Sequence, residues 1–596
     1  MIVLLGISGL YHLGDAWQGD LGYSGDVRTK LITGVLLVGV VGLFLEQMEL
    51  TAPLWRLLIA IVDYSIIAIV AFEIVEEYLH APVRKNYLRQ HIFSLLSFLV
   101  FATLFGYSKF AAGVNEELGN LGYLSVIIIR NAFLTLKVIS RLRRLSEFMR
   151  SVLNHPAQTV VLSFAMVILV GTLLLMMPFT TTDGMGLSFT ESLFTATSAV
   201  CVTGLIVVDT ATAFTLWGWI IIVLLIQVGG LGIMILSYFT IFVIRRSISH
   251  EDTVLLSYML EEGNIDEIRR AVLRIVGFTL SLEGVGALLL GVAFYQEGFA
   301  LGDAAFYGLF HGISAFCNAG FALFTTSLEQ FSANALVNLV VVALIVAGGL
   351  SFVVLTDLWR LFVPARGYGN GRARPLGVGS RAVLSVTGVA LLASFFVFYF
   401  LEHGKAMAEL SLGEQILATL FQAVTLRTAG FNTLPFEQFQ TATYLAMMLF
   451  MFVGGASGST AGGIKVNSVA VIWSYLRSVR TGSRDSILFR HRVSRNQIAS
   501  AFSVLLFGVT AVFLGTFLLS IFESFSLLEV VFESVSAFGT VGLSTGITAG
   551  LSQAGRYVII LLMFVGRVGP LTLLSASTTE EERLRVRYPT ADISVG

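Results

Sequence analysis

Long apolar stretches recur along the whole chain and are separated by short polar joints. Four of them lie within residues 1–150, and each is about 20 residues long, enough to cross a hydrocarbon core. From Pro156 onward a unit of a long apolar stretch, a shorter segment and a second apolar stretch occurs four times. The pattern predicts an all-α polytopic membrane protein with a four-helix transmembrane region before four repeats. The repeats are 156–246, 271–360, 381–476 and 497–577, followed by a tail at 578–596.

The middle segment of each repeat is too short to cross a bilayer. These segments are 189–205, 303–321, 412–431 and 527–543. A hydroxyl residue followed by an acid, as in Thr190-Glu191 and Ser411…Glu414, is typical of a helix N-terminus. We therefore expect each middle segment to be a half-helix that enters the membrane and returns as a loop. Each repeat then reads as helix, pore loop, helix, arranged around a central pore.

Each middle segment ends in the same motif, whose third residue is glycine. The motif residues are Val202, Thr203 and Gly204; Asn318, Ala319 and Gly320; Thr428, Ala429 and Gly430; and Thr540, Val541 and Gly542. One such motif in a membrane protein is usually a turn, but four copies 110 to 116 residues apart are an internal repeat. Glycine permits the positive φ that aligned carbonyls need, and a ring of carbonyls can replace the water shell of a cation. The motif therefore predicts a cation filter, with extra side-chain oxygens from Asn318, Thr428 and Thr540 at its inner mouth.

The composition excludes a soluble globular protein, because 56% of the residues are hydrophobic and 13% are charged, against about 25% charged in soluble domains. Arginine and lysine gather at the joints between repeats. The positive-inside rule then places both chain ends in the cytoplasm and the four pore loops on the outer side of the cell membrane, with twelve spanning helices. Two cysteines, Cys201 and Cys317, provide no disulfide framework, so we expect them to be small buried packing residues.

A glycine-rich stretch interrupts the last apolar part of the third repeat. Its predicted gating residues are Gly454, Gly455, Ser457, Gly458, Ser459, Gly462 and Gly463. Each glycine costs a helix about 0.5–1 kcal/mol relative to alanine, so this stretch cannot hold a stable helix. We expect a movable plug beneath the filter; the alternative is close packing between helices through small residues.

Three basic residues lie near these features. Arg567 is expected in the middle of an apolar helix, Tyr557–Leu574, where a cation normally faces a cavity or a partner such as a buried carboxylate. Arg427 precedes the third motif and is expected to brace that loop from behind, because a guanidinium in the ion path would repel cations. Lys465 is expected to extend its ammonium toward the membrane edge.

With these features the chain resembles the Trk/Ktr/HKT superfamily of potassium transporters, in particular its Ktr membrane subunit. The resemblance covers about 156–596 and rests on the four motifs, Gln227–Gly232, Gly454–Lys465, Arg567 and the ending Tyr588–Gly596. It implies that the filter glycines select potassium over sodium. Sodium-permissive relatives have a serine at the first filter glycine, where this chain has Gly204.

The resemblance also implies how ion passage is gated and which proteins the chain assembles with. In that family a loop gate lies beneath the filter, and the arginine matching Arg567 obstructs the path and contacts the gate. Ktr relatives are homodimers controlled by a cytosolic nucleotide-binding regulatory subunit. The implied substrate is the potassium ion, with no covalent cofactor, and the resemblance leaves open sodium as a coupling or activating ion.

Several alternatives stay open at this point. The region 1–150 resembles a voltage-sensor bundle through Arg130 and Lys137, yet a structural or regulatory bundle fits its sparse charges better. A potassium pump subunit would need a separate ATPase chain. A membrane enzyme is disfavoured, because His311 and His403 stand alone and no nucleophile–base pair lies at membrane depth. A scaffold would have no use for four filter loops.

Overall fold

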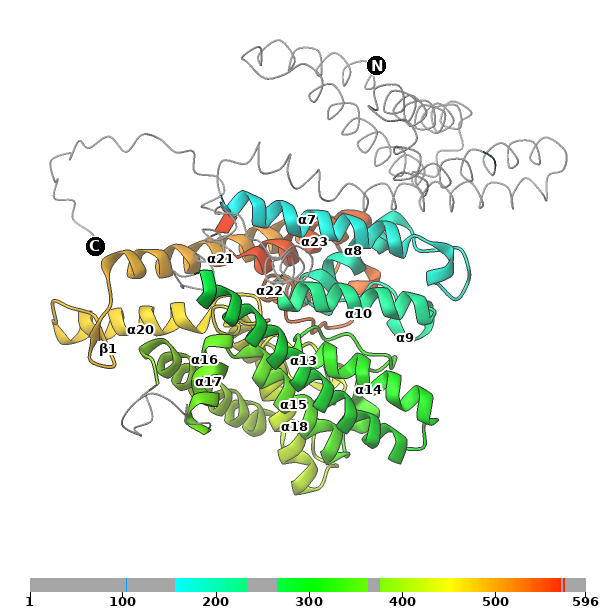
Figure 1. Cartoon of the computed structure of the whole chain (residues 1–596), viewed down its shortest axis with the longest axis horizontal. Coiled ribbons are helices and arrows are strands. Elements are labelled where there is room, and N and C mark those ends of the chain that lie inside the picture. Colours follow the sequence, from blue (N-terminus) through cyan, green and yellow to red (C-terminus); the bar gives the residue numbers. More distant parts are fainter. Residues whose placement is uncertain (1–102, 104–155, 233–264, 363–375, 570–571, 574–596) are drawn as a thin grey trace, which may run out of the picture. The chain divides into compact units, whose positions relative to one another are not determined.

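The computed structural model describes residues 103, 156–232, 265–362, 376–569 and 572–573, which are the coloured parts of Figure 1. The chain divides into two units, Met1–Lys137 and Val138–Gly596, and all described residues except Thr103 belong to the second. The predicted four-helix region and the tail at 578–596 therefore lie outside the described residues, apart from Thr103.

The described part is mostly helical, and its helices follow one another in a recurring order. Long helices are α7 (Pro156–Leu175), α13 (Ile265–Gln296), α17 (Val378–Glu402) and α21 (Arg495–Phe522). Each is followed by a shorter helix: α8 (Phe189–Val200), α14 (Leu301–Phe316), α18 (Leu412–Thr425) and α22 (Leu527–Gly539). Then come α10 (Leu216–Leu231), α15 (Ala335–Gly349), α19 (Thr441–Phe452) and α23 (Gln553–Val568).

Smaller elements complete the described part. They are α9 (Thr210–Ala213), α16 (Phe352–Phe362), α20 (Val466–Thr481), β1 (Ile487–Leu488), β2 (His491–Arg492), and the 3₁₀ turns η1 (Pro178–Thr180), η2 (Glu329–Phe331), η3 (Phe436–Gln438) and η4 (Thr548–Gly550). The strands β1 and β2 pair antiparallel, with Leu488 opposite His491. They form a small hairpin between α20 and α21, which lie side by side in Figure 1 and contact one another.

Three of the described helices are long and apolar enough to cross a membrane: Val272–Gln296, Val378–Glu402 and Arg495–Phe522. A fourth span results if the bent pair α15 and α16 is counted as one. The long helices turn large apolar side chains outward; Leu288, Phe400 and Leu506 are each about 70% exposed. The short helices are largely buried instead, even at hydroxyl residues such as Ser198 and Ser534. Apolar outside and partly polar inside is the arrangement expected in lipid.

Capping residues explain where three of the short helices begin. Ser188, Ser411 and Ser526 each accept a hydrogen bond from the backbone of a glutamate three residues later, and that glutamate bonds back to the serine amide. This reciprocal pair satisfies two free donors of the helix end. The prediction for Ser411…Glu414 is confirmed. In the first repeat the prediction is wrong, because the helix is capped by Ser188 and not at Thr190.

The third helix of every repeat ends or bends after 12 to 16 residues. α10 and α23 end at Gly232 and Gly569, whose φ angles are +83° and +89°. α15 bends by 107° into α16, and α19 gives way to the glycine-rich loop before α20. The interruption predicted for the third repeat is confirmed, and the corresponding helices of the other three repeats end or bend as well. Positive-φ glycines and the bend at Leu350–Ser351 end the other helices.

Candidate functional site

The chain takes a left-handed turn directly after each short helix. Val202, Asn318, Thr428 and Thr540 have φ angles between +50° and +67°, which residues with a side chain rarely adopt. The motif glycine two residues later also has positive φ in every repeat, from +70° at Gly320 to +95° at Gly204. The four motifs therefore share one strained backbone conformation. Such strain persists where the surrounding structure enforces it, and it clusters at functional sites.

The four motif glycines approach one another in a closed cycle. A methyl group placed on Gly204 would lie 2.5 Å from the carbonyl oxygen of Ala319, and one on Gly320 would lie 2.8 Å from that of Ala429. The cycle continues from Gly430, whose methyl group would lie 2.6 Å from the carbonyl oxygen of Val541. A methyl group on Gly542 would overlap the carbonyl oxygen of Thr203 and so return to the first repeat. The structure thus brings together four segments that are more than 300 residues apart at the extremes.

Hydrogen bonding leaves the oxygens of these motifs free. The amides of Thr203, Ala319 and Val541 donate to carbonyls of their own short helices, at 2.8 Å each. Across the described residues, no hydrogen bond reaches a backbone carbonyl of the twelve motif residues. Buried polar groups are normally paired. A cycle of buried, unpaired carbonyl oxygens is suited to a bound cation, which these oxygens can coordinate in place of water.

Side-chain oxygens at the start of the motifs are also buried and unpaired. Oδ1 of Asn318, Oγ1 of Thr428 and Oγ1 of Thr540 have no hydrogen-bond partner in the described part of the chain. The Asn318 amide nitrogen, in contrast, donates to the carbonyl of Arg427 at 3.1 Å. That bond turns the amide so that its oxygen is the free atom. These are the three side-chain oxygens that the sequence suggested.

The glycine-rich loop packs against three of the four motif segments. A methyl group on Gly454 would lie 3.5 Å from Cγ2 of Thr428, and one on Gly462 would overlap the Thr540 hydroxyl. Thr460 donates its hydroxyl to carbonyls at the ends of α14 and α15, those of Phe316 and Gly348. Most of the loop is buried, but Ser457 and Gly458 are exposed. Ser459 bonds within the loop, to the carbonyl of Ala456 at 2.7 Å.

Arg567 connects this loop to the first repeat. Its two terminal nitrogens donate to the carbonyls of Thr460, in the glycine-rich loop, and of Gly229, near the end of α10. The residue lies in the last turn of α23 and not in the middle of a helix, so the expected position is corrected. α23 ends at Val568 because Gly569 takes a positive φ. The predicted contact between Arg567 and the glycine-rich loop is present.

The other two basic residues singled out from the sequence, Arg427 and Lys465, also donate to carbonyls of the glycine-rich loop. Arg427 is buried and donates to the carbonyl of Gly454 at 2.9 Å, so it holds the third motif against the glycine-rich loop, as the bracing interpretation requires. Lys465 donates its ammonium to the carbonyl of Ala461 at 2.6 Å. The expectation that Lys465 reaches for the membrane edge is wrong, because its nearest acceptor lies within the loop that precedes it.

Contacts between loops join neighbouring repeats beyond the motif glycines. The Thr325 hydroxyl donates to Asp209 at 2.9 Å, which links the second repeat to the first. Asn432 links the third repeat to the second, since its side chain donates to Glu329 at 2.6 Å and its carbonyl accepts from Leu328. Burial raises the pKa of the Glu329 carboxyl above its ordinary value, although the bond from Asn432 opposes this shift.

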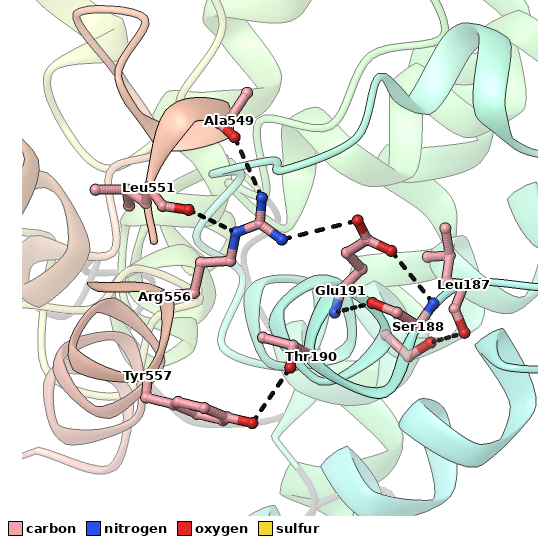
Figure 2. A network of polar contacts seen from close by, with 9 residues as sticks. Leu187, Ser188, Thr190, Glu191, Ala549, Leu551, Arg556 and Tyr557 are labelled. Atoms are coloured by element: carbon pink, nitrogen blue, oxygen red, sulfur yellow. Dashed lines mark hydrogen bonds and ion pairs between the residues drawn. The ribbon is translucent and has the colours of Figure 1, made fainter. Parts of the chain in front are cut away.

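The fourth repeat is joined to the first through Arg556 (Figure 2). Arg556, in α23, donates to the carbonyls of Leu551 and Ala549 at 3.1 and 3.2 Å and lies 3.7 Å from the Glu191 carboxylate of α8. The hydroxyl groups of Tyr557 and Thr190 lie 3.2 Å apart beside it. Because Glu191 also caps α8, one carboxylate serves both the helix start and the contact between the first and last repeats.

Replacing Arg556 with alanine is expected to lower the thermal unfolding midpoint of the detergent-purified protein. The change removes two bonds to carbonyls and a partly buried ion pair, a loss of about 1–3 kcal/mol. The matched control is Arg492→Ala, because Arg492 pairs with Asp485 at 2.9 Å with 67% and 46% of the two side chains exposed. Such a pair contributes about 0–1 kcal/mol. Equal shifts in both variants would contradict the role given to Arg556.

Sequence reasoning gave no role to several buried polar residues of the short and long helices, although it noted His311 as a solitary histidine. Glu283 of α13 accepts a hydrogen bond from Gln227 at 3.1 Å and lies 3.7 Å from the Cys317 sulfur. His311 and Glu533 are both completely buried within short helices. Each is an ionisable residue in an apolar stretch, and that signal alone could have identified it. The two cysteines are fully buried, as expected of packing residues.

Comparison with known proteins covers most of the chain. The profile of the TrkH family, described as cation transport protein, matches residues 126–364 and 375–584. The chain is 36% identical to the Ktr system potassium uptake protein B of Bacillus subtilis, over 74% of this chain and 97% of that protein. It is 32% identical to the potassium/sodium uptake protein NtpJ of Enterococcus hirae, over 74% and 97%. The crystal structure of the potassium transporter TrkH from Vibrio parahaemolyticus aligns with a TM-score of 0.56 at 18% identity, covering 76% of this chain and 98% of that one. At this low sequence identity, the structural similarity to TrkH supports a shared fold and nothing more.

Proposed function

Because the chain belongs to the TrkH family of cation transport proteins, we propose that it takes up potassium through a gated, channel-like pore. Members of this family are transporters and not enzymes, as the sequence predicts. The observation that carries the proposal is the closed cycle of four motif glycines with unpaired carbonyl oxygens. Such a cycle provides oxygen ligands at fixed positions around one axis, which is what a dehydrated cation requires.

The proposed filter consists of the twelve motif residues. The charge of the ion is balanced by oriented dipoles, since the short helices end at the filter and a helix C-terminus carries partial negative charge. Unpaired oxygens of Asn318, Thr428 and Thr540 would add ligands at one end. Potassium is favoured as the ion because the Bacillus subtilis relative is named a potassium uptake protein and because Gly204 occupies the first filter position. The name of NtpJ supports a dependence on sodium as a second proposal.

The proposed gate is the glycine-rich loop together with Arg567. The loop lies against the second, third and fourth motif segments, and Arg567 ties it to the first repeat. Any ion that leaves the filter on this side meets the loop. Bonds from Arg567 to two carbonyls favour the arrangement in which the loop stays in place. Movement of a glycine-rich segment needs little side-chain rearrangement, because most of its residues are small.

The wider arrangement follows from the charge pattern and the family. We propose a multi-pass protein of the cell membrane with twelve spans, both chain ends in the cytoplasm, and four repeats at the boundaries given by the sequence. The proposed assembly is a homodimer that binds a cytosolic nucleotide-binding regulatory subunit. The basic joints between repeats suit contact with such a subunit. For residues 1–150 we propose a structural or regulatory bundle.

Growth on low potassium tests the function. Expression of the chain in bacteria that lack potassium uptake is expected to restore growth without any added ATPase chain. The variants Gly204→Ser and Gly430→Ser are expected to lower the ratio of potassium to sodium uptake by about tenfold, since each places a side chain between neighbouring filter segments. Unchanged growth and an unchanged ratio in both variants would contradict the filter. Growth that requires an ATPase chain would support a pump subunit instead.

A further inference from the structure

Two buried ionisable residues occupy equivalent places in the second and fourth repeats. His311 lies seven residues before Asn318, and Glu533 lies seven residues before Thr540. Seven residues are about two helical turns, so both side chains leave the same face of their short helices. Both are completely buried, and neither takes part in the filter or the gate described above.

His311 holds the chain that follows the second filter glycine. Its Nδ1 lies 2.7 Å from the carbonyl of Tyr307, so Nδ1 must carry the proton, and Nε2 accepts the amide of Leu323 at 3.2 Å. Leu323 is three residues beyond Gly320. The ring is stacked on Phe324, with centroids 4.9 Å apart, and meets the edge of Phe294. Both ring nitrogens are thus hydrogen-bonded to backbone groups, and the ring has one fixed orientation.

Glu533 holds the corresponding chain in the fourth repeat. One carboxylate oxygen accepts the hydroxyl of Ser544 at 3.0 Å, and the other accepts that of Thr548. Ser544 is two residues beyond Gly542. Within the described residues, no lysine or arginine pairs with this carboxylate. Burying an unpaired acid is costly, so a purely packing role would be served better by an apolar side chain.

The second and fourth filter segments are not neighbours in the cycle of glycines. Gly320 follows Gly204 and precedes Gly430, whereas Gly542 follows Gly430 and closes on Gly204. The two polar braces are therefore placed diagonally. The equivalent positions in the first and third repeats hold Thr195, whose hydroxyl is buried without a partner, and Phe421. Within the described residues, neither side chain hydrogen-bonds to the segment that follows its motif glycine.

From this geometry we infer that His311 and Glu533 are positioning residues that fix opposite sides of the filter and thereby set its preference for potassium over sodium. The inference rests on the proposed function. Ion selectivity depends on ligand oxygens that keep their positions, and each brace fixes the chain two or three residues beyond a ligand glycine. Without the braces the two segments can move outward or inward and accept a smaller ion.

Uptake of potassium and sodium by the full chain in uptake-deficient bacteria, normalised to the protein in the membrane, tests the inference. His311→Phe keeps the aromatic packing but removes both nitrogens, and Glu533→Leu keeps the volume but removes both oxygens. Each is expected to lower the potassium-to-sodium uptake ratio by about ten- to a hundredfold. His311→Gln and Glu533→Gln keep an acceptor and are expected to restore the ratio to within about threefold of the unmodified chain. Matched controls are Thr195→Val and Phe421→Leu, which should leave the ratio unchanged.

The outcomes separate this inference from the function on which it rests. If the unmodified chain takes up no potassium, the proposed function fails. If it does, and His311→Phe and Glu533→Leu reach the membrane with an unchanged ratio, the positioning role is wrong and the two residues serve stability alone. Should Glu533→Leu not reach the membrane, Ser544→Ala takes its place, because it removes one of the two hydroxyl groups that donate to Glu533 from the segment after Gly542. A ratio that stays unchanged in Ser544→Ala would equally overturn the role of Glu533.

Discussion

Cells that depend on this chain for potassium are expected to stop growing at low potassium when Gly542 is replaced by alanine. The added methyl group would overlap the carbonyl oxygen of Thr203 in the next filter segment, and φ at this position is +89°. Because backbone flanks the glycine, the clash can be relieved only by moving a filter segment. Displacing a ligand by about 1 Å can cost a hundredfold in rate, so uptake should fall to the background of cells without the chain.

The matched control for Gly542→Ala is Gly298→Ala. Gly298 has a similar φ of +97°, but nothing lies within 4 Å of a methyl group placed there. This control carries the same backbone strain, about 1–3 kcal/mol, without the clash at the filter. Growth and uptake should therefore stay close to those of the unmodified chain, at similar amounts of protein in the membrane. If both variants lose uptake equally, strain alone explains the loss and the cycle of glycines is not the conducting element.

Replacing Arg567 with alanine is expected to raise potassium flux. Its bonds to the carbonyls of Thr460 and Gly229 tie the glycine-rich loop, the proposed gate, to the first repeat, and a hydrogen bond from a charged donor contributes about 1.5–3 kcal/mol. Loss of even one such bond shifts the balance between held and released loop by about tenfold or more. The measurement is the initial rate of potassium uptake per molecule in the membrane, with Arg567→Lys expected to retain part of the restraint.

Arg556→Ala provides the control for Arg567→Ala. Both arginines belong to α23 and both donate to backbone carbonyls, but Arg556 lies near the start of the helix and bonds to Leu551 and Ala549, not to the glycine-rich loop. Its loss should lower stability without raising flux. Unaltered flux in Arg567→Ala, or the same rise in Arg556→Ala, would remove Arg567 from the gate.

The sequence was sufficient to locate the four converging motifs because their signal is local and repeated. Each motif needs a glycine with positive φ at one position. Four such motifs at nearly equal sequence spacing can be recognised without knowing how far apart they lie in the folded chain. The broken helix of the third repeat could be predicted for a similar reason, since several glycines lie within one short stretch. What the sequence could not give is the order in which the motifs approach one another, which depends on packing between distant segments.

The missed features depend on single residues whose effect is decided by their surroundings. Gly232 and Gly569 end α10 and α23, yet each helix contains a further glycine just before its end, Gly230 and Gly566, so the sequence did not single out the glycine that ends the helix. Lys465 near a predicted membrane edge has two plausible acceptors, water or a carbonyl, and only the fold decides between them. His311 was noticed as a solitary histidine, but its partners are a backbone carbonyl and a backbone amide, which no side-chain pattern reveals.

All four corners of the candidate filter belong to one chain, and their first residues are Val202, Asn318, Thr428 and Thr540. In a pore assembled from four identical subunits, one codon change alters every corner together. Here the same change alters a single corner and leaves three intact. Mutation can therefore change the ion preference one filter segment at a time, and the four segments of a single molecule can differ in sequence. A diagonal pair such as the second and fourth can also specialise while the other pair preserves conduction.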